Sequence, residues 1–269
     1  MLTPELIEAR RGNITASKAH AMMAGWDKPR PVDIFPAAIY EWIAEAKRKP
    51  LVKEIKDVLE CDVSGASINA AWAAYQFDKP SQGLLTYAEE LACDELFEAD
   101  PLVWDGSTVH MDIGNEREIE AMEKLIEATG LPFDKIGDDQ IHVSVDGIGA
   151  TPDGIVYDDL DLIVTGAEVK CRSPLHHARQ LLITDNASLR EHDPERYCQI
   201  QVQMYVTGAD EWYSACFNPC ARNVTHRFHY CIIKRDAAFL DVFAKRAQQV
   251  FEHKATFLAM LNDTRSKAA

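Results

Sequence analysis

The sequence predicts an α/β protein in which helices cover a β-sheet. One observation is the segment 145–171, which reads as a strand, a turn and a second strand. Another is the pair of strand-like segments 211–217 and 227–233, which are joined by a long turn. The third is that residues 115–130 and 236–261 place apolar side chains at the spacing of amphipathic helices. Together these patterns indicate an α/β fold.

The composition is ordinary for a globular protein, with 47% hydrophobic and 26% charged residues in a chain of 269. No run of about 18 apolar residues is present, and the first five residues lack the basic and apolar regions of a signal peptide. Seven cysteines without a dense framework suit buried thiols in a reducing compartment. These features predict a cytoplasmic protein with no membrane span.

The net charge of −15 is weak evidence against nucleic-acid binding, because a surface that binds phosphates is basic. The charge is uneven along the chain. Residues 112–161 are rich in acids, whereas residues 234–267 carry more bases than acids. An acidic cluster is expected where divalent cations are held, and an acidic protein can still present a basic groove. The charge alone therefore does not exclude a protein that binds nucleic acid.

The N-terminal part is predicted to be helical. Thr15 or Ser17 is a candidate cap for a helix that runs to Met23. Free N–H groups at the start of that helix, beside Arg10 and Arg11, would bind phosphate. The alternative is a capped surface helix with solvated arginines, and spacing alone favours this alternative. Further helices are expected over residues 37–49, 64–77 and 87–97.

The helix predicted over residues 115–130 ends at a glycine that is followed closely by a proline. Its apolar stripe includes Met122 and Leu125, and most of its glutamates lie on the opposite face. Glu118 falls inside the stripe. A glutamate there either packs its stem with the carboxylate in solvent, or is buried and faces a cation. The residues alone leave both interpretations open.

The segment 145–171 carries polar groups where a buried sheet should be apolar. On the strand 167–171, Glu168 and Lys170 share one face, because side chains alternate along a strand. The Thr-Pro-Asp-Gly turn upstream carries Asp153 toward the same place. Burying these charges is costly unless something pairs with them. The pattern indicates a hydrolytic site with a divalent metal, and the alternative is a structural ion pair.

A further helix is expected to begin at Pro194 and to end near Gly208, with Gln199 and Gln203 one turn apart on one face. A zinc site is a weaker prediction, because the spacing C-x3-C-x5-H-x2-H is too short for a zinc finger. The residues concerned are Cys216, Cys220, His226 and His229. No C-x-x-C motif supports an iron–sulfur cluster.

Four segments occur in an order that is typical of one enzyme family. They are RRGNITAS at 10–17, Gly114 followed by Glu118, TPDG at 151–154 with EVKC at 168–171, and QIQ at 199–201. This pattern resembles the phage lambda-type (YqaJ-like) recombination exonucleases. These enzymes belong to the restriction-endonuclease-like superfamily, whose PD-(D/E)XK motif is a proline–aspartate turn followed by Glu-x-Lys on a strand.

The resemblance implies a restriction-endonuclease-like core, in which a central mixed β-sheet is flanked by helices and preceded by a helical N-terminal arm. It implies a single nuclease domain, with the arm in residues 1–110, the catalytic core in 111–235 and a C-terminal helix in 236–269. One departure from the family is the connection at 157–161, which is longer than we expect and implies a longer hairpin turn.

The resemblance also implies a deoxyribonuclease with a two-metal mechanism. Such an enzyme uses Mg²⁺, with Mn²⁺ able to substitute, to digest one strand of linear duplex DNA from its 5′ end. It releases 5′-mononucleotides and leaves a 3′ overhang. The matching positions assign metal binding to Asp153, Glu168 and the Val169 carbonyl, catalysis to Lys170, Glu118 and Gln199, and DNA 5′-phosphate binding to Arg10 and Ser17. Arg11 is a near alternative to Arg10.

Enzymes of this family form ring-shaped homotrimers in the bacterial host cell and pass their product to a single-strand annealing protein. The expected partners here are therefore double-stranded DNA ends, further copies of the chain and such an annealing protein. Three alternatives stay open: a related nuclease of other polarity, such as an endonuclease or repair exonuclease; a non-catalytic module that binds DNA ends; and a hydrolase of small phosphoesters.

Overall fold

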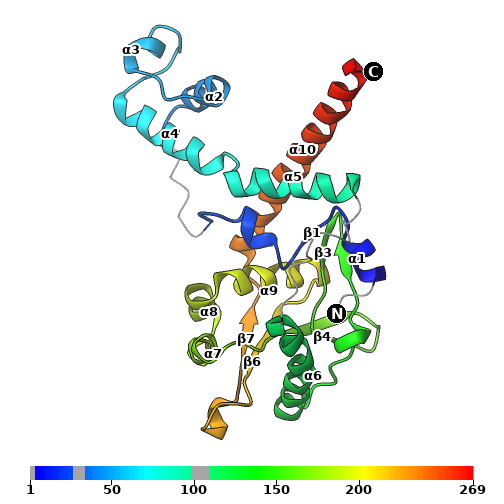
Figure 1. Ribbon diagram of the computed structural model, residues 1–269. Coiled ribbons are helices and arrows are strands. Elements are labelled where there is room, and N and C mark those ends of the chain that lie inside the picture. The colour runs from blue at the N-terminus through cyan, green and yellow to red at the C-terminus, as the bar shows by residue number, and fades with distance from the viewer. Residues whose placement is uncertain (1–3, 27–33, 98–108, 269) are drawn as a thin grey trace. The chain divides into compact units, whose positions relative to one another are not determined.

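The computed structural model describes residues 4–26, 34–97 and 109–268 (Figure 1). Contacts divide the chain into two compact units, one of residues Ala24–Gln82 and the other of Met1–Met23 with Gly83–Ala269. Each unit has a core of its own, and each is described by itself. The division into an arm, a catalytic core and a C-terminal helix stays a prediction.

The smaller unit consists of the helices α2 (Ala37–Ala46), α3 (Val52–Ile55) and α4 (Gly65–Asp78). The helices predicted over 37–49 and 64–77 are therefore confirmed. The core of this unit is built from aliphatic side chains, and its buried members are Ile39, Ile43, Ile55, Val63, Ile68 and Ala71.

The larger unit contains a four-stranded sheet in the order β4-β5-β6-β7. Its strands are β4 (Gly154–Tyr157), β5 (Ile163–Lys170), β6 (Glu211–Phe217) and β7 (Phe228–Lys234). β5 and β6 run parallel, whereas the β4–β5 and β6–β7 pairs are antiparallel. The predicted mixed sheet of an α/β fold is thereby confirmed.

A second sheet in the same unit has the order β1-β3-β2. It consists of β1 (Ile14–Thr15), β2 (Val143–Val145) and β3 (Ile148–Ala150). β1 pairs with β3 in parallel, and β2 pairs with β3 in antiparallel orientation. This small sheet was not predicted.

The prediction of an α-helix that is capped by Thr15 or Ser17 and runs to Met23 is wrong. The Ile14 N–H donates to the Gly147 carbonyl at 2.9 Å, and the Ala16 N–H donates to the Gly149 carbonyl at 2.9 Å. Only a short 3₁₀ helix, η1 (Ala19–Met22), follows. Backbone hydrogen bonds to a strand distant in sequence therefore outweigh the local helix-capping preference.

Helices cover both faces of the four-stranded sheet. α6 (Val109–Thr129) packs against the face that carries Val169, and α9 (Pro194–Thr207) packs against the face that carries Glu168. The remaining helices of this unit are α1 (Pro4–Arg10), α5 (Gln82–Leu96), η2 (Gly137–Asp139), α7 (Pro174–Gln180), α8 (Asn186–His192), η3 (Val224–His226) and α10 (Ala237–Ala268). None of the helices in the described ranges is long and apolar enough to cross a membrane.

One aspartate closes the connection between β4 and β5. Asp158 Oδ1 accepts hydrogen bonds from the N–H groups of Leu160 at 2.8 Å and Leu162 at 2.9 Å. The long connection predicted from the sequence is thus an ordered hairpin loop. At the other end of the hairpin, the Asp153 N–H donates to the Ala167 carbonyl at 3.1 Å. This pairing fixes Asp153 beside the polar face of β5.

We expect Gly166→Ala to destabilise the larger unit. A Cβ at Gly166 would lie 2.3 Å from the Trp212 ring and 2.8 Å from the Gly154 carbonyl oxygen. The substitution should lower the free energy of unfolding by ~1–3 kcal/mol, because overpacking forces the backbone to shift. Urea denaturation followed by tryptophan fluorescence measures the effect.

The matched control for this substitution is Gly65→Ala. A Cβ at Gly65 meets nothing within 4 Å, and the residue lies in a helix. The control should therefore be neutral or slightly stabilising. Wild-type stability in Gly166→Ala would contradict the close packing of β5 against Trp212.

Candidate functional site

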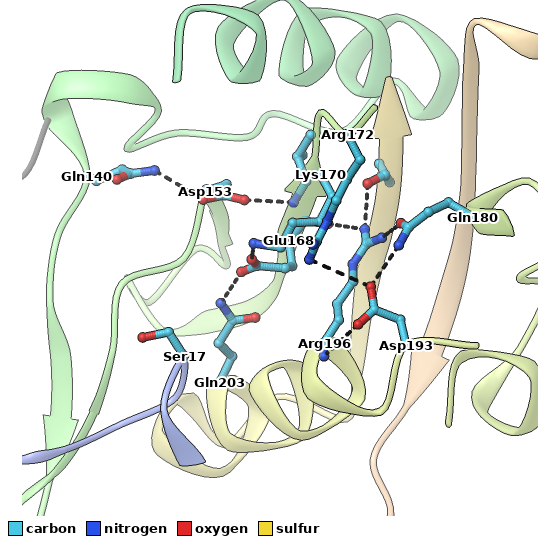
Figure 2. A network of polar contacts seen from close by, with 12 residues as sticks. Ser17, Gln140, Asp153, Glu168, Lys170, Arg172, Gln180, Asp193, Arg196 and Gln203 are labelled. Atoms are coloured by element: carbon cyan, nitrogen blue, oxygen red, sulfur yellow. Dashed lines mark hydrogen bonds and ion pairs between the residues drawn. The ribbon is translucent and has the colours of Figure 1, made fainter. Parts of the chain in front are cut away.

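The β4–β5 hairpin brings Asp153, Glu168 and Lys170 together (Figure 2). Asp153 directly precedes β4, and its Oδ2 accepts a hydrogen bond from the Val169 N–H at 2.7 Å. Glu168 and Lys170 lie on one face of β5, because side chains alternate along a strand. The structure thus places the three ionic side chains that the sequence singled out at one point.

The Glu168 side chain is 1% exposed, and both of its carboxylate oxygens have partners. Lys170 Nζ lies 2.5 Å from Oε1, and Gln203 Nε2 donates to Oε2 at 2.6 Å. The buried Arg196 of α9 donates to the Glu168 backbone carbonyl at 2.7 Å. A buried carboxylate is tolerated only when it is paired and hydrogen-bonded. These contacts therefore hold Glu168 in a single orientation.

Three carboxylates share this place with one ammonium group. Burial and the nearby Glu168 raise the pKa of Glu118 on α6 to about 7, against the opposing effect of Lys170. Burial and the charges of Glu168 and Glu118 raise the pKa of Asp153 well above its usual value. Burial lowers the pKa of Lys170, but Glu168 and Asp153 raise it by more, so the amine is protonated. Lys170 and the buried Arg196 act on these carboxylates, but the pKa values of Asp153 and Glu118 are still raised, so an added cation would stabilise their ionised forms.

A cavity of about 170 Å³ opens beside these groups. Arg10 and Ser17 line it together with Asp153, Glu168 and Lys170. Arg10 Nη2 donates to Ser17 Oγ at 3.3 Å. The two residues predicted to bind a phosphate therefore share one cavity with the predicted metal ligands.

Arg10 and Arg11 differ in their partners. Arg11 pairs with Glu8 at 2.8 Å and donates to the carbonyl groups of Asp94 and Phe97. Arg10 is partly buried, and this burial lowers its pKa. Within the described ranges Arg10 has no carboxylate partner. Arg10 is therefore the arginine of this pair that is available to bind an anion.

A family model supplies the independent comparison. The YqaJ-like viral recombinase domain matches residues 5–210, which is most of the chain. The chain belongs to this family. The match includes all the residues that carry the resemblance noted in the sequence, from the Arg10 segment to the glutamines of α9, and so confirms it.

Solved structures share the fold of this YqaJ-like domain. The alkaline exonuclease LHK-Exo from Laribacter hongkongensis is 19% identical with a TM-score of 0.63, over 99% of this chain and 100% of that one. The structure of LHK-Exo in complex with dAMP is 20% identical with a TM-score of 0.62, at the same coverage. A phage-related exonuclease from Haemophilus somnus is 14% identical with a TM-score of 0.57, over 93% of this chain and 96% of that one. No curated protein matches the chain significantly.

Gln199 and Gln203 of α9 have different places in the YqaJ-like domain. Gln199, the glutamine selected by the resemblance, lines the cavity beside Asp153 and Lys170. Gln203, one turn later, is buried and holds Glu168. The sequence placed both glutamines on one face of the helix but gave no reason to prefer Gln203. The rotation of α9 against the sheet decides which of them reaches the carboxylate.

Two further residues that line the cavity, Gln140 and His142, were not predicted from the sequence of the YqaJ-like domain. Gln140 Nε2 donates to Asp153 Oδ1 at 3.3 Å, and His142 Nδ1 lies 3.2 Å from Thr151 Oγ1. Burial and the nearby Arg10 lower the pKa of His142, so its ring is neutral at pH 7. Gln140 and His142 belong to an irregular segment between η2 and β2, where no periodic pattern exists to reveal them.

The donors of the site suit a hard divalent cation, because such cations prefer carboxylate and carbonyl oxygens. In the described part of the chain no three His, Cys, Asp or Glu side chains are gathered at metal-ligand spacing, and Glu168 is held by Lys170 and Gln203. Burial and the neighbouring carboxylates nevertheless raise the pKa values of Asp153 and Glu118, and a bound cation would favour their ionised forms. His229 is one of the four residues of the weaker zinc prediction. Its Nε2 lies 2.6 Å from the Ile183 carbonyl oxygen, so this nitrogen already has a protein partner.

We expect Gln203→Ala to lower the free energy of unfolding by ~1–3 kcal/mol, because it leaves a buried Glu168 oxygen without a hydrogen bond. The matched control is Gln199→Ala on the same helix, which leaves the partners of Glu168 intact and should change stability by less than ~0.5 kcal/mol. Chemical denaturation of both variants without metal provides the measurement. Equal losses in the two variants would contradict the assignment of Gln203 as the residue that positions Glu168.

Proposed function

We propose that this protein is a divalent-metal-dependent exonuclease that digests one strand of linear duplex DNA from its 5′ end. The products are 5′-mononucleotides and a 3′ overhang for recombination by single-strand annealing. One observation carries the proposal: a cavity joins the carboxylates of Asp153 and Glu168 and the amine of Lys170 to an arginine that has no acidic partner in the described ranges. Membership of the YqaJ-like recombinase family supports it, and the structural neighbours named above are described as exonucleases.

Asp153, Glu168 and the Val169 carbonyl would hold Mg²⁺, with Mn²⁺ able to substitute. When bound, a pair of such ions supplies Lewis-acid stabilisation of the phosphate and an activated water. We propose two ions per site because the sequence resembles the PD-(D/E)XK enzymes, for which a two-metal mechanism is expected.

The chain's own residues perform the remaining tasks. Lys170 orients the attacking water and offsets the carboxylate charge. Glu118, whose pKa is raised to about 7, exchanges protons with water near neutral pH, and Gln199 orders water in the cavity. Arg10 and Ser17 bind the 5′-phosphate through charge-assisted hydrogen bonds.

The expected partners follow from the same proposal. DNA ends are the substrate, a single-strand annealing protein receives the 3′ overhang, and the active form is a ring-shaped homotrimer in the cytoplasm of a bacterial host. A ring that encloses the duplex would explain processive digestion without ATP, and the sequence contains no GxxxxGK motif.

A time course on linear duplex labelled at either end tests the function. With Mg²⁺ we expect label at the 5′ end to appear at once as mononucleotide, while label at the 3′ end stays in long strands. A covalently closed circle should resist. Cutting of the circle would establish an endonuclease instead, and binding without Mg²⁺-dependent turnover would establish a non-catalytic end-binding module.

Lys170→Ala should abolish cleavage and leave DNA binding intact, because the lysine acts on water and carboxylates while the duplex contacts other residues. Turnover in single-round assays and binding by gel shift measure the two properties separately. A variant that cleaves at the wild-type rate would refute the role of Lys170.

Asp153→Asn should abolish Mg²⁺ binding measured by calorimetry. Because the pKa of Asp153 is raised, its charge destabilises the folded state at pH 7 in the absence of metal. The variant should therefore be at least as stable as wild type without metal, and it should gain nothing when Mg²⁺ is added. Asp159→Asn changes an exposed aspartate in the hairpin loop and serves as the control. Unchanged Mg²⁺ binding in Asp153→Asn would exclude this residue as a ligand.

Arg10→Ala should reduce the preference for 5′-phosphorylated over 5′-hydroxyl ends by about 10-fold or more, since a charge-assisted hydrogen bond contributes ~1.5–3 kcal/mol. Arg11→Ala should instead lower stability and keep the preference, because Arg11 is bound to Glu8 and to backbone carbonyls. Competition between the two kinds of end gives the ratio. Equal rates on 5′-phosphorylated and 5′-hydroxyl ends in the wild type would contradict the proposal that Arg10 anchors the 5′-phosphate.

A further inference from the structure

A second, larger cavity adjoins the candidate site and has no role in the reaction proposed above. Its volume is about 390 Å³, at the lower end of the ~300–1,000 Å³ range of small-molecule sites. α1, β1 and the end of α5 surround it, and these elements lie close together in the larger unit (Figure 1). Arg10 and Thr15 line both cavities, so they form the partition between them.

The partition carries polar groups that protein partners do not fully use. Thr15 is 7% exposed, and its hydroxyl, although close to that of Tyr87, makes no hydrogen bond of good geometry. Its N–H donates to Tyr87 Oη at 3.0 Å, which fixes the strand. Arg10 adds a cation without a carboxylate partner in the described ranges. Buried polar groups are normally satisfied, so a ligand group at this partition is the simplest explanation.

Part of the lining of this cavity is apolar. Ile7 of α1, Leu91 of α5 and Phe97, which follows α5, form this part, and Asp94 also lines the cavity. Ile7 and Phe97 are 53% and 61% exposed. Arg11 donates to the Asp94 and Phe97 carbonyls, which holds the wall in place. An exposed aromatic ring and aliphatic side chains next to a cation match the chemistry of a nucleobase attached to a phosphate.

We propose that this cavity takes an unpaired nucleotide on the 5′ side of the phosphate that Arg10 binds. The inference rests on the proposed function, because it uses Arg10 as the phosphate anchor. At a blunt end the anchored phosphate is the terminal one. At a one-nucleotide 5′ overhang it is the phosphate between the first and second nucleotides, and the extra base enters the second cavity.

Hydrolysis of an overhang then occurs one phosphodiester bond further toward the 3′ end than hydrolysis of a blunt end. The hydroxide of the attacking water joins the next phosphorus, the bond from phosphorus to the 3′-oxygen breaks, and that oxygen takes the remaining proton. The first product from an overhang is accordingly a dinucleotide with a 3′-hydroxyl, whereas a blunt end yields a mononucleotide.

The experiment compares two 5′-labelled duplexes, one blunt and one with a single-nucleotide 5′ overhang, in the same Mg²⁺ buffer. Wild-type protein should release labelled mononucleotide from the first and labelled dinucleotide from the second. A third duplex carries an abasic overhang, which keeps the phosphate and lacks the base. Its rate of dinucleotide release relative to the blunt end should fall by about tenfold, the effect of losing one stacked base. This comparison needs no variant protein.

Cys93→Trp fills the cavity from its rim, where the cysteine is exposed. The ratio of overhang to blunt-end cleavage should fall by about tenfold, with the blunt-end rate of each protein as its reference. Cys220→Trp is the matched control, because it places the same ring at an exposed cysteine that borders a different cavity. The control should keep the wild-type ratio.

The outcomes distinguish the second nucleotide site from the proposed exonuclease activity. Mononucleotide as the first product from the overhang, at a rate that neither the abasic residue nor Cys93→Trp changes, would overturn the second site and leave the exonuclease standing. Failure to digest either duplex with Mg²⁺ would overturn the proposed function, and this inference with it.

Discussion

The structure of the site depends on the burial of one carboxylate, that of Glu168. A charge at 1% exposure inside a sheet is stable only with close partners, and these come from two elements. Lys170 is supplied by the same strand and Gln203 by α9, and Arg196 of α9 adds a hydrogen bond to the Glu168 backbone carbonyl. The position of α9 against β5 is therefore constrained by electrostatics as well as by apolar packing.

Arg196 extends this constraint through the larger unit. It is 2% exposed and donates to the carbonyls of Glu168 and Ala215, on two adjacent parallel strands, and to the Gln180 side chain. Gln180 in turn donates to Asp193 at 2.7 Å, and Asp193 caps α9 by accepting from the Arg196 N–H (Figure 2). The helix cap, the helix and two strands are thus joined by one set of buried hydrogen bonds. The set fixes α9 against β5 and β6, although the buried Arg196 Nε has no hydrogen-bond partner in the part of the chain that the structure describes.

Arg10, the residue proposed to bind phosphate, is positioned by other elements than Glu168 is. Arg10 ends α1, and the next residues pair with β3, so the small sheet sets the distance between Arg10 and the Asp153 turn. Arg11 binds Glu8 and two backbone carbonyls, whereas Arg10 lines the cavity. A partly buried cation with no carboxylate partner among the described residues is destabilising by itself, which is a reason to regard this arrangement as functional. The proposed metal ligands Asp153 and Glu168 are thereby positioned by the four-stranded sheet, and the proposed phosphate-binding Arg10 by the segment that leads into the small sheet.

The sequence by itself determined the strands at 211–217 and 227–233, the placement of Glu168 and Lys170 on one face, and the direction of the Asp153 turn. Those features follow from alternation along a strand and from turn chemistry, which are local. The tertiary structure decided that residues 14–16 form a strand, that Gln203 rather than Gln199 holds Glu168, and that Arg196, Gln140 and His142 surround the site. These outcomes depend on hydrogen bonds between segments far apart in sequence and on the rotation of α9 against the sheet, and no local pattern of residues encodes either.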